Sequence, residues 1–205
     1  MNLIVFDFDS TLMDGETIDF LAKEYNVEYE VKEITNKAMK GELDFYESLV
    51  KRVSLLKGME LNKVNEICNN LPFNKNAKET IPILKDKYKV VCFSGGFNNA
   101  TIPAKEYLGL HGEFSNILHS KNGYLTGLVS GSMCFSNSKG IMLKTLKDIF
   151  NFDKTIVIGD GANDLSMFKY ADIKIAYNAK DILKKEADYC ISDLFDIVNI
   201  LQQYN

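Results

Sequence analysis

The sequence predicts an α/β protein with a doubly wound parallel sheet and a helical insert after its first strand. Three observations support this prediction. Short apolar runs alternate with amphipathic helical stretches, which is typical of a parallel sheet. One long segment interrupts the alternation, and acidic or glycine-rich motifs follow several of the apolar runs. The length of 205 residues allows one core with a modest insertion.

The first strand is predicted over the apolar run LIVF, and two carboxylates follow it directly. Four consecutive apolar residues indicate a strand that is covered on both faces. Asp7 and Asp9, in the motif DFDST, would then lie at the carboxyl end of this strand, where open α/β sheets bind ligands. Two like charges at this place destabilise the fold unless they share a cation or a proton. The motif therefore predicts that a cation or a proton is shared at this edge.

Residues 16–70 show helical periodicity and no strand signal. In one helix of this segment, Asp44 and Glu47 have the spacing of a capping box, and Gly58 follows the helix end. The apolar residues on one face of that helix are Phe45, Leu49, Val50, Val53 and Leu56. We expect residues 16–70 to form a small helical lid over the acidic sheet edge. Residues 1–15 and 71–205 would form the core.

Further strands are predicted at KVVCF (89–93), TIVIG (155–159), IKIAY (173–177) and DYCI (188–191). A minor β-hairpin off the main sheet is expected near residues 113–135, where EFSNIL and YLTGLV flank the turn KNG. Pro82 and Pro103 lie within helical patterns and leave the boundaries of those two helices open.

The motif SGGFNN follows the predicted strand 89–93. Ser94 offers a hydroxyl, while Gly95 and Gly96 allow the backbone to approach a ligand closely and to begin a helix. This combination suits the oxygens of a phosphate group.

The motif GDGANDLSMF follows the strand 155–159 and contains Asp160, Asn163 and Asp164. Lys139, in SNSKG, lies near the start of the preceding helix and places a positive charge over the same edge. Alone, each of these residues is typical of a turn, a helix cap or a solvated surface. Their convergence on the carboxyl edge of one sheet favours a shared site.

Phosphoryl transfer to a carboxylate is the chemistry that this set of residues fits. Mg²⁺, held by Asp7, Asp160 and an oxygen such as the Asp9 carbonyl, would neutralise a phosphate ester. One Asp7 oxygen could then attack phosphorus to form an aspartyl phosphate. Asp9 could protonate the leaving oxygen and later accept a proton from water. The groups expected to stabilise the phosphoryl oxygens are Ser94, the Gly95 amide and Lys139.

The motifs DFDSTL, SGGF, the SKG lysine and GDGANDLSMF together resemble the haloacid dehalogenase superfamily of phosphatases. The helical insert resembles the small cap type of that superfamily, and the resemblance implies its Rossmann-like core. The segments ETIDFLA, AMKGELDFYESLVKRVSLLKG and IAYNAK are similar to members that act on L-phosphoserine, over nearly the whole chain. The implied activity is hydrolysis of L-phosphoserine to L-serine and phosphate, the last step of serine biosynthesis.

The resemblance also implies roles for individual residues. Asp7 would be the nucleophile and Asp9 the acid/base. Asp164 would support the metal site without binding the metal directly. The implied ligands of Mg²⁺ are Asp7, the Asp9 backbone carbonyl and Asp160. The implied substrate contacts are Ser94, Gly95, Lys139 and Asn163 with the phosphoryl group, Glu16 with the ammonium, Arg52 with the carboxylate, and Met39 and Phe45 as a shield. A guanidinium matches a carboxylate bidentately, which makes the role of Arg52 chemically reasonable.

Composition limits the other function classes. The net charge of -4 and the pI near 5.3 provide no general attraction to nucleic acid or to an anionic membrane surface. The first apolar run stops at Asp7, so it resembles neither a signal peptide nor a membrane span, and a cytoplasmic protein is expected. The four cysteines show no metal-binding spacing and are expected to be reduced, mostly buried thiols. The sequence leaves a monomer and a homodimer open.

Two alternative functions stay open. A phosphotransferase of the same cap type would pass the phosphoryl group to another alcohol, such as homoserine, with similar site residues. A receiver-type signalling domain would instead carry a persistent phosphate on an aspartate as a switch. Asp9 and the long lid argue against a receiver, because an acid/base two residues from the nucleophile promotes hydrolysis.

Overall fold

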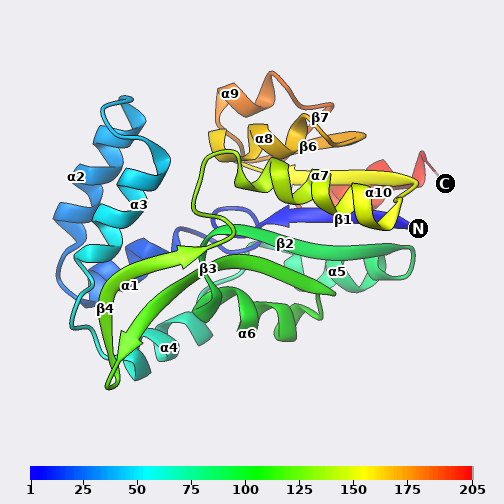
Figure 1. Ribbon diagram of the computed structural model, residues 1–205. Helices are drawn as coiled ribbons and strands as arrows, with labels where there is room; N and C mark the ends of the chain where they lie inside the picture. The colour runs from blue at the N-terminus through cyan, green and yellow to red at the C-terminus, as the bar shows by residue number, and fades with distance from the viewer. Residues whose placement is uncertain (205) are drawn as a thin grey trace.

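The computed structural model describes residues 1–204 and has the predicted α/β architecture (Figure 1). Seven strands form one sheet in the order β4-β3-β2-β1-β5-β6-β7. All neighbouring strands are parallel except β3 and β4. The strands are β1 (Asn2–Asp7), β2 (Tyr88–Phe97), β3 (Gly112–Lys121), β4 (Tyr124–Gly131), β5 (Lys154–Gly159), β6 (Ile173–Tyr177) and β7 (Tyr189–Ile191).

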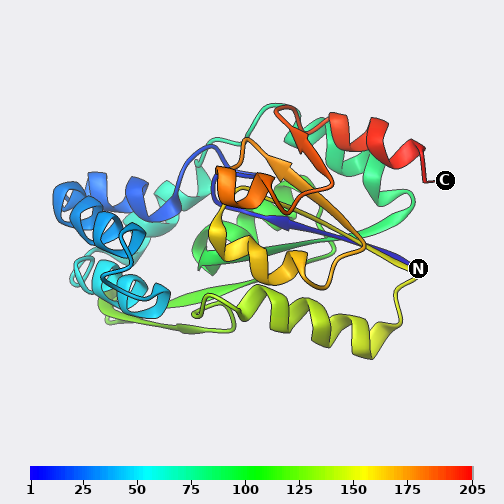
Figure 2. The same cartoon turned by 90° about the horizontal axis from the view of Figure 1, so that it is seen from above.

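Helices cover both faces of the sheet, as Figure 2 shows from above. One face packs against α5 (Ala77–Lys85), α6 (Asn98–Leu108) and α10 (Asp196–Gln202). The other packs against α7 (Ser138–Phe150), α8 (Leu165–Phe168) and α9 (Asp181–Lys184). In β1, Ile4 and Phe6 join the first core, and Leu3 and Val5 join the second. The run LIVF is continuously apolar because both faces of its strand are buried.

Four helices lie between β1 and α5: α1 (Thr17–Glu24), α2 (Glu28–Met39), α3 (Phe45–Ser54) and α4 (Leu61–Asn69). The capping box at the start of α3 is present, because the Asp44 side chain accepts from the Glu47 backbone and the Glu47 side chain accepts from the Asp44 backbone. Helices α2 and α3 pack together and project beyond the end of the sheet (Figure 1). Helix α4 packs against the core helix α6.

The hairpin β3–β4 belongs to the main sheet, so the expectation that it lies off the sheet was wrong. Strand β3 pairs in parallel with β2, whose outer edge would otherwise be unpaired, and β4 then pairs with β3. Asn122 and Gly123 have positive φ angles, as a tight hairpin turn requires. The hairpin tip also contacts residues 16–70, the helical segment that we call the cap. Gly58 N donates to the Leu125 carbonyl at 2.9 Å, and Leu61 N donates to the Gly123 carbonyl at 2.8 Å.

Strand β2 is longer than predicted and continues through the SGG motif to Phe97. The expectation that the glycines begin a helix was therefore wrong, because α6 begins at Asn98. The pairing of β2 with β3 shifts in register between Phe93 and Phe97, and Asn116 Nδ2 donates to the Gly95 carbonyl at 3.0 Å. This irregular end of β2 keeps Gly95 and Gly96 extended at the sheet edge.

The remaining expectations concern prolines, cysteines and membrane spans. Helices α5 and α6 continue past Pro82 and Pro103. The four cysteines are free, and three are buried, while Cys190 on the edge strand β7 is exposed. Among residues 1–204, no helix combines the length and the apolar character that spanning a membrane would require.

Candidate active site

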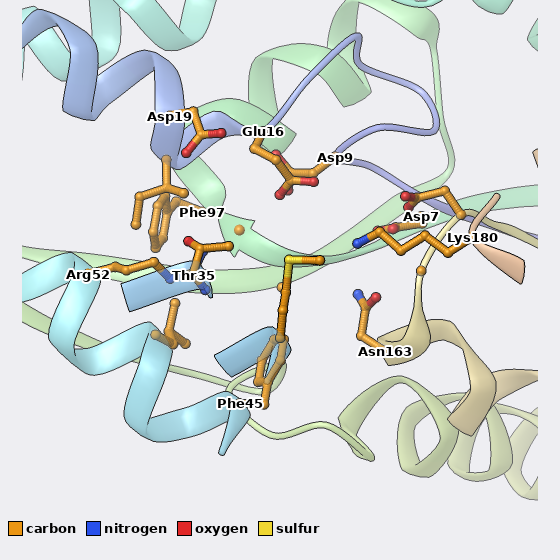
Figure 3. Close-up of a pocket in the computed structure, with 17 residues that line it drawn as sticks. Asp7, Asp9, Glu16, Asp19, Thr35, Phe45, Arg52, Phe97, Asn163 and Lys180 are labelled. Atoms are coloured by element: carbon orange, nitrogen blue, oxygen red, sulfur yellow. The ribbon is translucent and has the colours of Figure 1, made fainter. Parts of the chain in front are cut away.

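A pocket of about 250 Å³ separates the cap helices from the carboxyl ends of β1, β2 and β5 (Figure 3). Its walls come from both sides, so segments that are far apart in the sequence meet there. The predicted site residues that line it are Asp7, Asp9, Glu16, Met39, Phe45, Arg52, Gly95, Asp160 and Asn163. Ser94, Lys139 and Asp164 do not line the pocket; they are buried behind it, in contact with residues that do.

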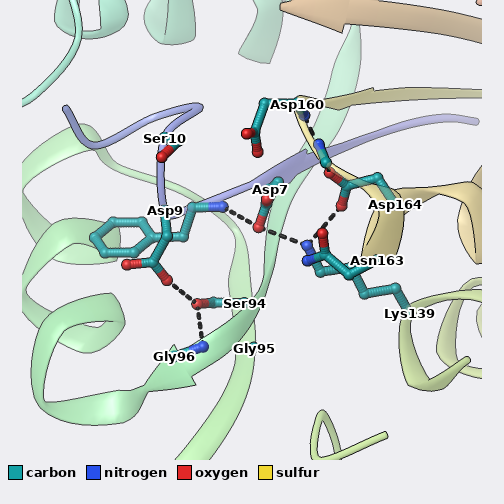
Figure 4. Close-up of polar contacts among 12 residues, drawn as sticks. Asp7, Asp9, Ser10, Ser94, Gly95, Gly96, Lys139, Asp160, Asn163 and Asp164 are labelled. Atoms are coloured by element: carbon teal, nitrogen blue, oxygen red, sulfur yellow. Dashed lines mark hydrogen bonds and ion pairs between the residues drawn. The ribbon is translucent and has the colours of Figure 1, made fainter. Parts of the chain in front are cut away.

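A buried network centred on Lys139 holds the floor of the site (Figure 4). Lys139 is the second residue of α7, and its Nζ lies 2.5 Å from Asp7 Oδ1 and 2.6 Å from Asp164 Oδ1. Burial lowers the pKa of Lys139, but the charges of Asp164 and Asp7 outweigh it and raise that pKa above its ordinary value. Lys139 is therefore a permanent cation beneath the pocket.

Asp7 is the last residue of β1 and is almost completely buried. Phe8 N donates to Asp7 Oδ1 at 2.7 Å, so both this bond and the Lys139 contact end on the same oxygen. Burial, and next the charge of Asp164, raise the pKa of Asp7 well above its usual range, although Lys139 opposes the rise. Ionised Asp7 thus needs more positive charge than Lys139 alone supplies.

Asp164 fixes the loop that carries Asp160. Its Oδ2 accepts hydrogen bonds from Asp160 N and Gly161 N, both at 3.0 Å. A methyl group at Gly159 would lie 2.4 Å from the Asp164 carboxyl, so only glycine fits at this position. With Oδ1 bound to Lys139, both Asp164 oxygens are engaged, and this residue serves as an anchor for its neighbours.

The carboxylates of Asp7, Asp160 and Asp164 have oxygens within 4.8 Å of one another. Burial, and next the charge of Asp164, raise the pKa of Asp160 to about 6. Three carboxylates around one buried ammonium leave net negative charge, and their hard oxygen atoms suit a divalent cation. The residues therefore fit a metal ion. Asp7 and Asp160, which line the pocket, are better placed to bind it than the fully engaged Asp164.

Asp9 is held from both sides of the pocket. Its Oδ1 accepts from Thr17 N at 2.7 Å and from Thr17 Oγ1 at 2.6 Å, and its Oδ2 lies 3.0 Å from Ser94 Oγ. Ser94 Oγ in turn accepts from Gly96 N at 2.9 Å. A methyl group at Gly96 would lie 2.6 Å from Asp9 Oδ2, so the backbone approaches this carboxyl as closely as glycine permits.

Glu16 directly precedes α1 and lines the pocket. Ser10 Oγ donates to Glu16 Oε1 at 2.9 Å, and Ser10 itself adopts a left-handed backbone with φ 59°. Desolvation by the surrounding protein, and next the charge of Asp9, raise the pKa of Glu16 to about 8. A cation that bound beside Glu16 would stabilise its ionised form.

Arg52 of α3 faces Glu16 from the other side of the pocket (Figure 3). Its Nε donates to the Ser48 carbonyl at 3.3 Å. Burial lowers the pKa of Arg52, while the charges of Glu16 and Asp19 oppose that shift. The cap therefore presents two acidic groups, Glu16 and Asp19, and one basic group, Arg52, to a ligand.

The cap touches the core across the pocket. A methyl group at Gly95 would lie 3.0 Å from Phe45 Cζ, so the Phe45 ring lies directly over this glycine. Tyr46 of α3 also stacks on Phe135, which precedes α7, with ring centroids 5.1 Å apart. These contacts join the cap to the core.

Several functional residues were missed by the sequence analysis. Thr17 binds Asp9, yet a threonine at a helix start carries no catalytic signal. Gly96 lines the pocket as its motif SGGFNN led us to expect, and the unpredicted lining residues are Ile18, Asp19, Thr35, Leu49, Phe97, Gly161 and Lys180. Lys180 lies in IAYNAK, a motif that the family resemblance includes, so it could have been considered.

Comparison with known proteins places the chain among phosphatases. Residues 1–172 match the family model of haloacid dehalogenase-like hydrolases. The chain is 56% identical over 203 residues to the phosphoserine phosphatase of Wolinella succinogenes, an alignment that covers 97% of this chain and 98% of that protein. It is 51% identical over 206 residues to the phosphoserine phosphatase of Campylobacter jejuni subsp. doylei, covering 98% and 100%.

Solved structures of phosphoserine phosphatase have the same fold. A substrate-bound complex and a phospho-aspartyl intermediate analogue each superpose with a TM-score of 0.90 at 48% identity, and each comparison covers 97% of both chains.

Proposed function

Because this chain belongs to the family of haloacid dehalogenase-like hydrolases, we propose that it hydrolyses L-phosphoserine to L-serine and phosphate, the last step of serine biosynthesis. The observation that carries this proposal is that one pocket is lined both by the buried Asp7 of the core and by Glu16 and Arg52 of the cap. The full-length similarity to relatives named phosphoserine phosphatase supports the same substrate. We place the reaction in the cytoplasm, where free thiols stay reduced.

In this proposal, residues 16–70 act as the lid that recognises the amino-acid part of the substrate. The guanidinium of Arg52 binds the substrate carboxylate, and Glu16 binds the ammonium. Met39 and Phe45 exclude water from the closed site. This assignment matches the two charges that serine adds to a phosphate ester.

The phosphoryl group would lie between Asp7 and Asn163, above the Gly95 amide, with Lys139 and Ser94 behind. We propose Mg²⁺ as the cation at this centre, held by the carboxylates of Asp7 and Asp160 and the backbone carbonyl of Asp9. When bound, Mg²⁺ would withdraw negative charge from the phosphoryl oxygens and so allow an anionic nucleophile to approach. Lys139 and Asp164 keep Asp7 and Asp160 in position.

The reaction then proceeds in two steps on this chain's own residues. An Asp7 carboxylate oxygen attacks phosphorus, the bond from phosphorus to the serine oxygen breaks, and Asp9 gives its proton to the departing alkoxide. Water next attacks the phosphorus of the aspartyl phosphate, Asp9 accepts a proton from it, and phosphate leaves with Asp7 regenerated. The Thr17 and Ser94 contacts hold the Asp9 carboxyl in one orientation for both transfers.

The test is phosphate release from L-phosphoserine by the purified chain with Mg²⁺, with and without EDTA. Phosphoethanolamine, phosphothreonine and sugar phosphates serve as comparison esters. A strong Mg²⁺-dependent preference for phosphoserine supports the proposal. Equal rates on all esters would reject the role of the cap, and transfer of phosphate to added homoserine would show a phosphotransferase.

A further inference from the structure

Lys180 is a second lysine at the site, and it differs from Lys139 in its surroundings. It follows β6 and lines the pocket, and Figure 3 shows its side chain extended with the nitrogen toward the interior. Lys139 is buried between two carboxylates, whereas Lys180 is exposed to the pocket and to solvent. Among residues 1–204, no ion pair within 4.0 Å includes Lys180.

The backbone of Lys180 is fixed at the metal-binding edge. Its N–H donates to the Asp160 carbonyl at 2.9 Å, and its own carbonyl accepts from Leu183 N at 2.9 Å and Lys184 N at 3.2 Å. Its charge acts on the same neighbour, because it lowers the pKa of Asp160 against the larger effect of burial. The side chain therefore starts from a backbone position that is fixed beside Asp160.

The charge balance of the pocket leaves a role for this ammonium. Lys139 is already shared by Asp7 and Asp164, so its charge is largely compensated before a ligand enters. Lys180 is the lining lysine without a carboxylate partner, and it lies on the core side of the pocket, where the phosphoryl group is proposed to bind. A phosphate dianion would meet it without breaking an existing ion pair.

We propose that Lys180 binds a non-bridging oxygen of the phosphoryl group, first in the substrate and then in the product phosphate. This inference deepens the proposed function and depends on its site. Lys180 would thus be a substrate-binding residue on the solvent side of the phosphoryl group, opposite the buried Lys139. No bond is made or broken by it.

The charge of Lys180 has opposite effects on the two ions that bind beside it. Its removal weakens the binding of an anion, because one attractive charge is lost. The same removal strengthens the binding of a divalent cation at Asp160, or leaves it unchanged, because one repulsive charge is lost. A residue that only supported the loop would weaken both when replaced.

The test compares Lys180→Met with Lys185→Met, which removes an equal charge from an exposed residue at the other end of α9 that does not line the pocket. Calorimetry measures the Kd of Mg²⁺ alone, and then the Kd of inorganic phosphate in the presence of Mg²⁺. We expect Lys180→Met to weaken phosphate binding about three- to tenfold, as for a partly solvated charge pair, and not to weaken Mg²⁺ binding. Lys180→Arg should restore most of the phosphate affinity, and Lys185→Met should change neither constant.

Two results would overturn the inference. One is equal phosphate affinity in Lys180→Met and Lys185→Met, and the other is a parallel loss of phosphate and Mg²⁺ affinity in Lys180→Met. Phosphoserine turnover by the unmodified chain is measured separately. If that turnover is absent while Lys180→Met still weakens phosphate binding selectively, the substrate proposal fails and the role of Lys180 stands. An unmodified chain that binds no phosphate in the presence of Mg²⁺ would reject the role of Lys180, whereas turnover alone decides the substrate proposal.

Discussion

Thr17 donates two hydrogen bonds to a single oxygen of Asp9, from its hydroxyl at 2.6 Å and from its backbone N–H at 2.7 Å. Thr17 is the first residue of α1 and is buried, whereas Asp9 follows β1 in the core. The residue proposed to move the proton is therefore oriented by the first helix of the cap segment. Because of this contact, the orientation of the Asp9 carboxyl depends on the position of Thr17 at the start of α1.

Thr17→Val should lower kcat by about tenfold or more with a smaller change in KM, because it removes a hydrogen bond to a carboxyl while it keeps the side-chain shape. Thr17→Ser keeps the hydroxyl and should restore most of kcat. Steady-state kinetics on phosphoserine with both variants measure this. If Thr17→Ser were as slow as Thr17→Val, the hydroxyl would not be the important group.

Asp7→Asn should abolish turnover, with a loss of kcat on the order of 10³ or more, because an amide is a poor nucleophile. The metal-free variant should unfold at the same temperature as the parent chain or at a higher one. The reason is that burial and Asp164 make ionised Asp7 costly to the fold. Thermal unfolding and phosphate release measure the two effects. Asp14→Asn, at an exposed acid outside the pocket, is the matched control, and near-parental turnover by Asp7→Asn would reject the nucleophile.

Arg52→Ala should lower kcat/KM for phosphoserine about a hundredfold, since it removes a charged partner of the substrate carboxylate. Phosphoethanolamine carries the ammonium but no carboxylate, so its hydrolysis should change much less. Lys51→Ala removes an exposed charge from the same helix and should affect neither ester. Equal losses on both esters in Arg52→Ala would refute the proposed carboxylate contact.

The stability of the chain without metal or substrate should fall as the pH rises from about 5 to about 8. Glu16 has a pKa raised to about 8 in the folded state, so in this range the folded chain binds more protons at this group than the unfolded chain does. Stability then decreases with pH until Glu16 is ionised in both states. Glu16→Gln should flatten this slope in thermal unfolding measured over the pH range, whereas Glu30→Gln on the exposed side of α2 should leave it unchanged. An unchanged slope in Glu16→Gln would contradict the raised pKa.

Local patterns in the amino-acid sequence were enough to predict the strands, the sheet and the acidic edge. The run LIVF, buried on both faces, predicted β1, and the alternation of strands and helices predicted the doubly wound sheet. The proximity of Asp7 and Asp160 could be predicted without the tertiary structure, because the carboxyl ends of parallel strands share one edge of the sheet. The predicted pocket residues of the cap, Glu16, Met39, Phe45 and Arg52, came from the family resemblance, since a side chain on a helix carries no such signal alone.

The partners of these groups depend on contacts in the folded chain and could not be predicted from local patterns. The hairpin joined the sheet because the outer edge of β2 was free to pair with β3, and no local pattern states which edge is free. Ser94 lies 85 residues from Asp9 in the chain but contacts its carboxyl, a partner that no local pattern predicts. Lys139 and Lys180 look alike in the sequence, yet one is buried between two acids and the other faces the pocket. Burial and charge pairing give each lysine its chemistry, and both depend on contacts between distant segments of the folded chain.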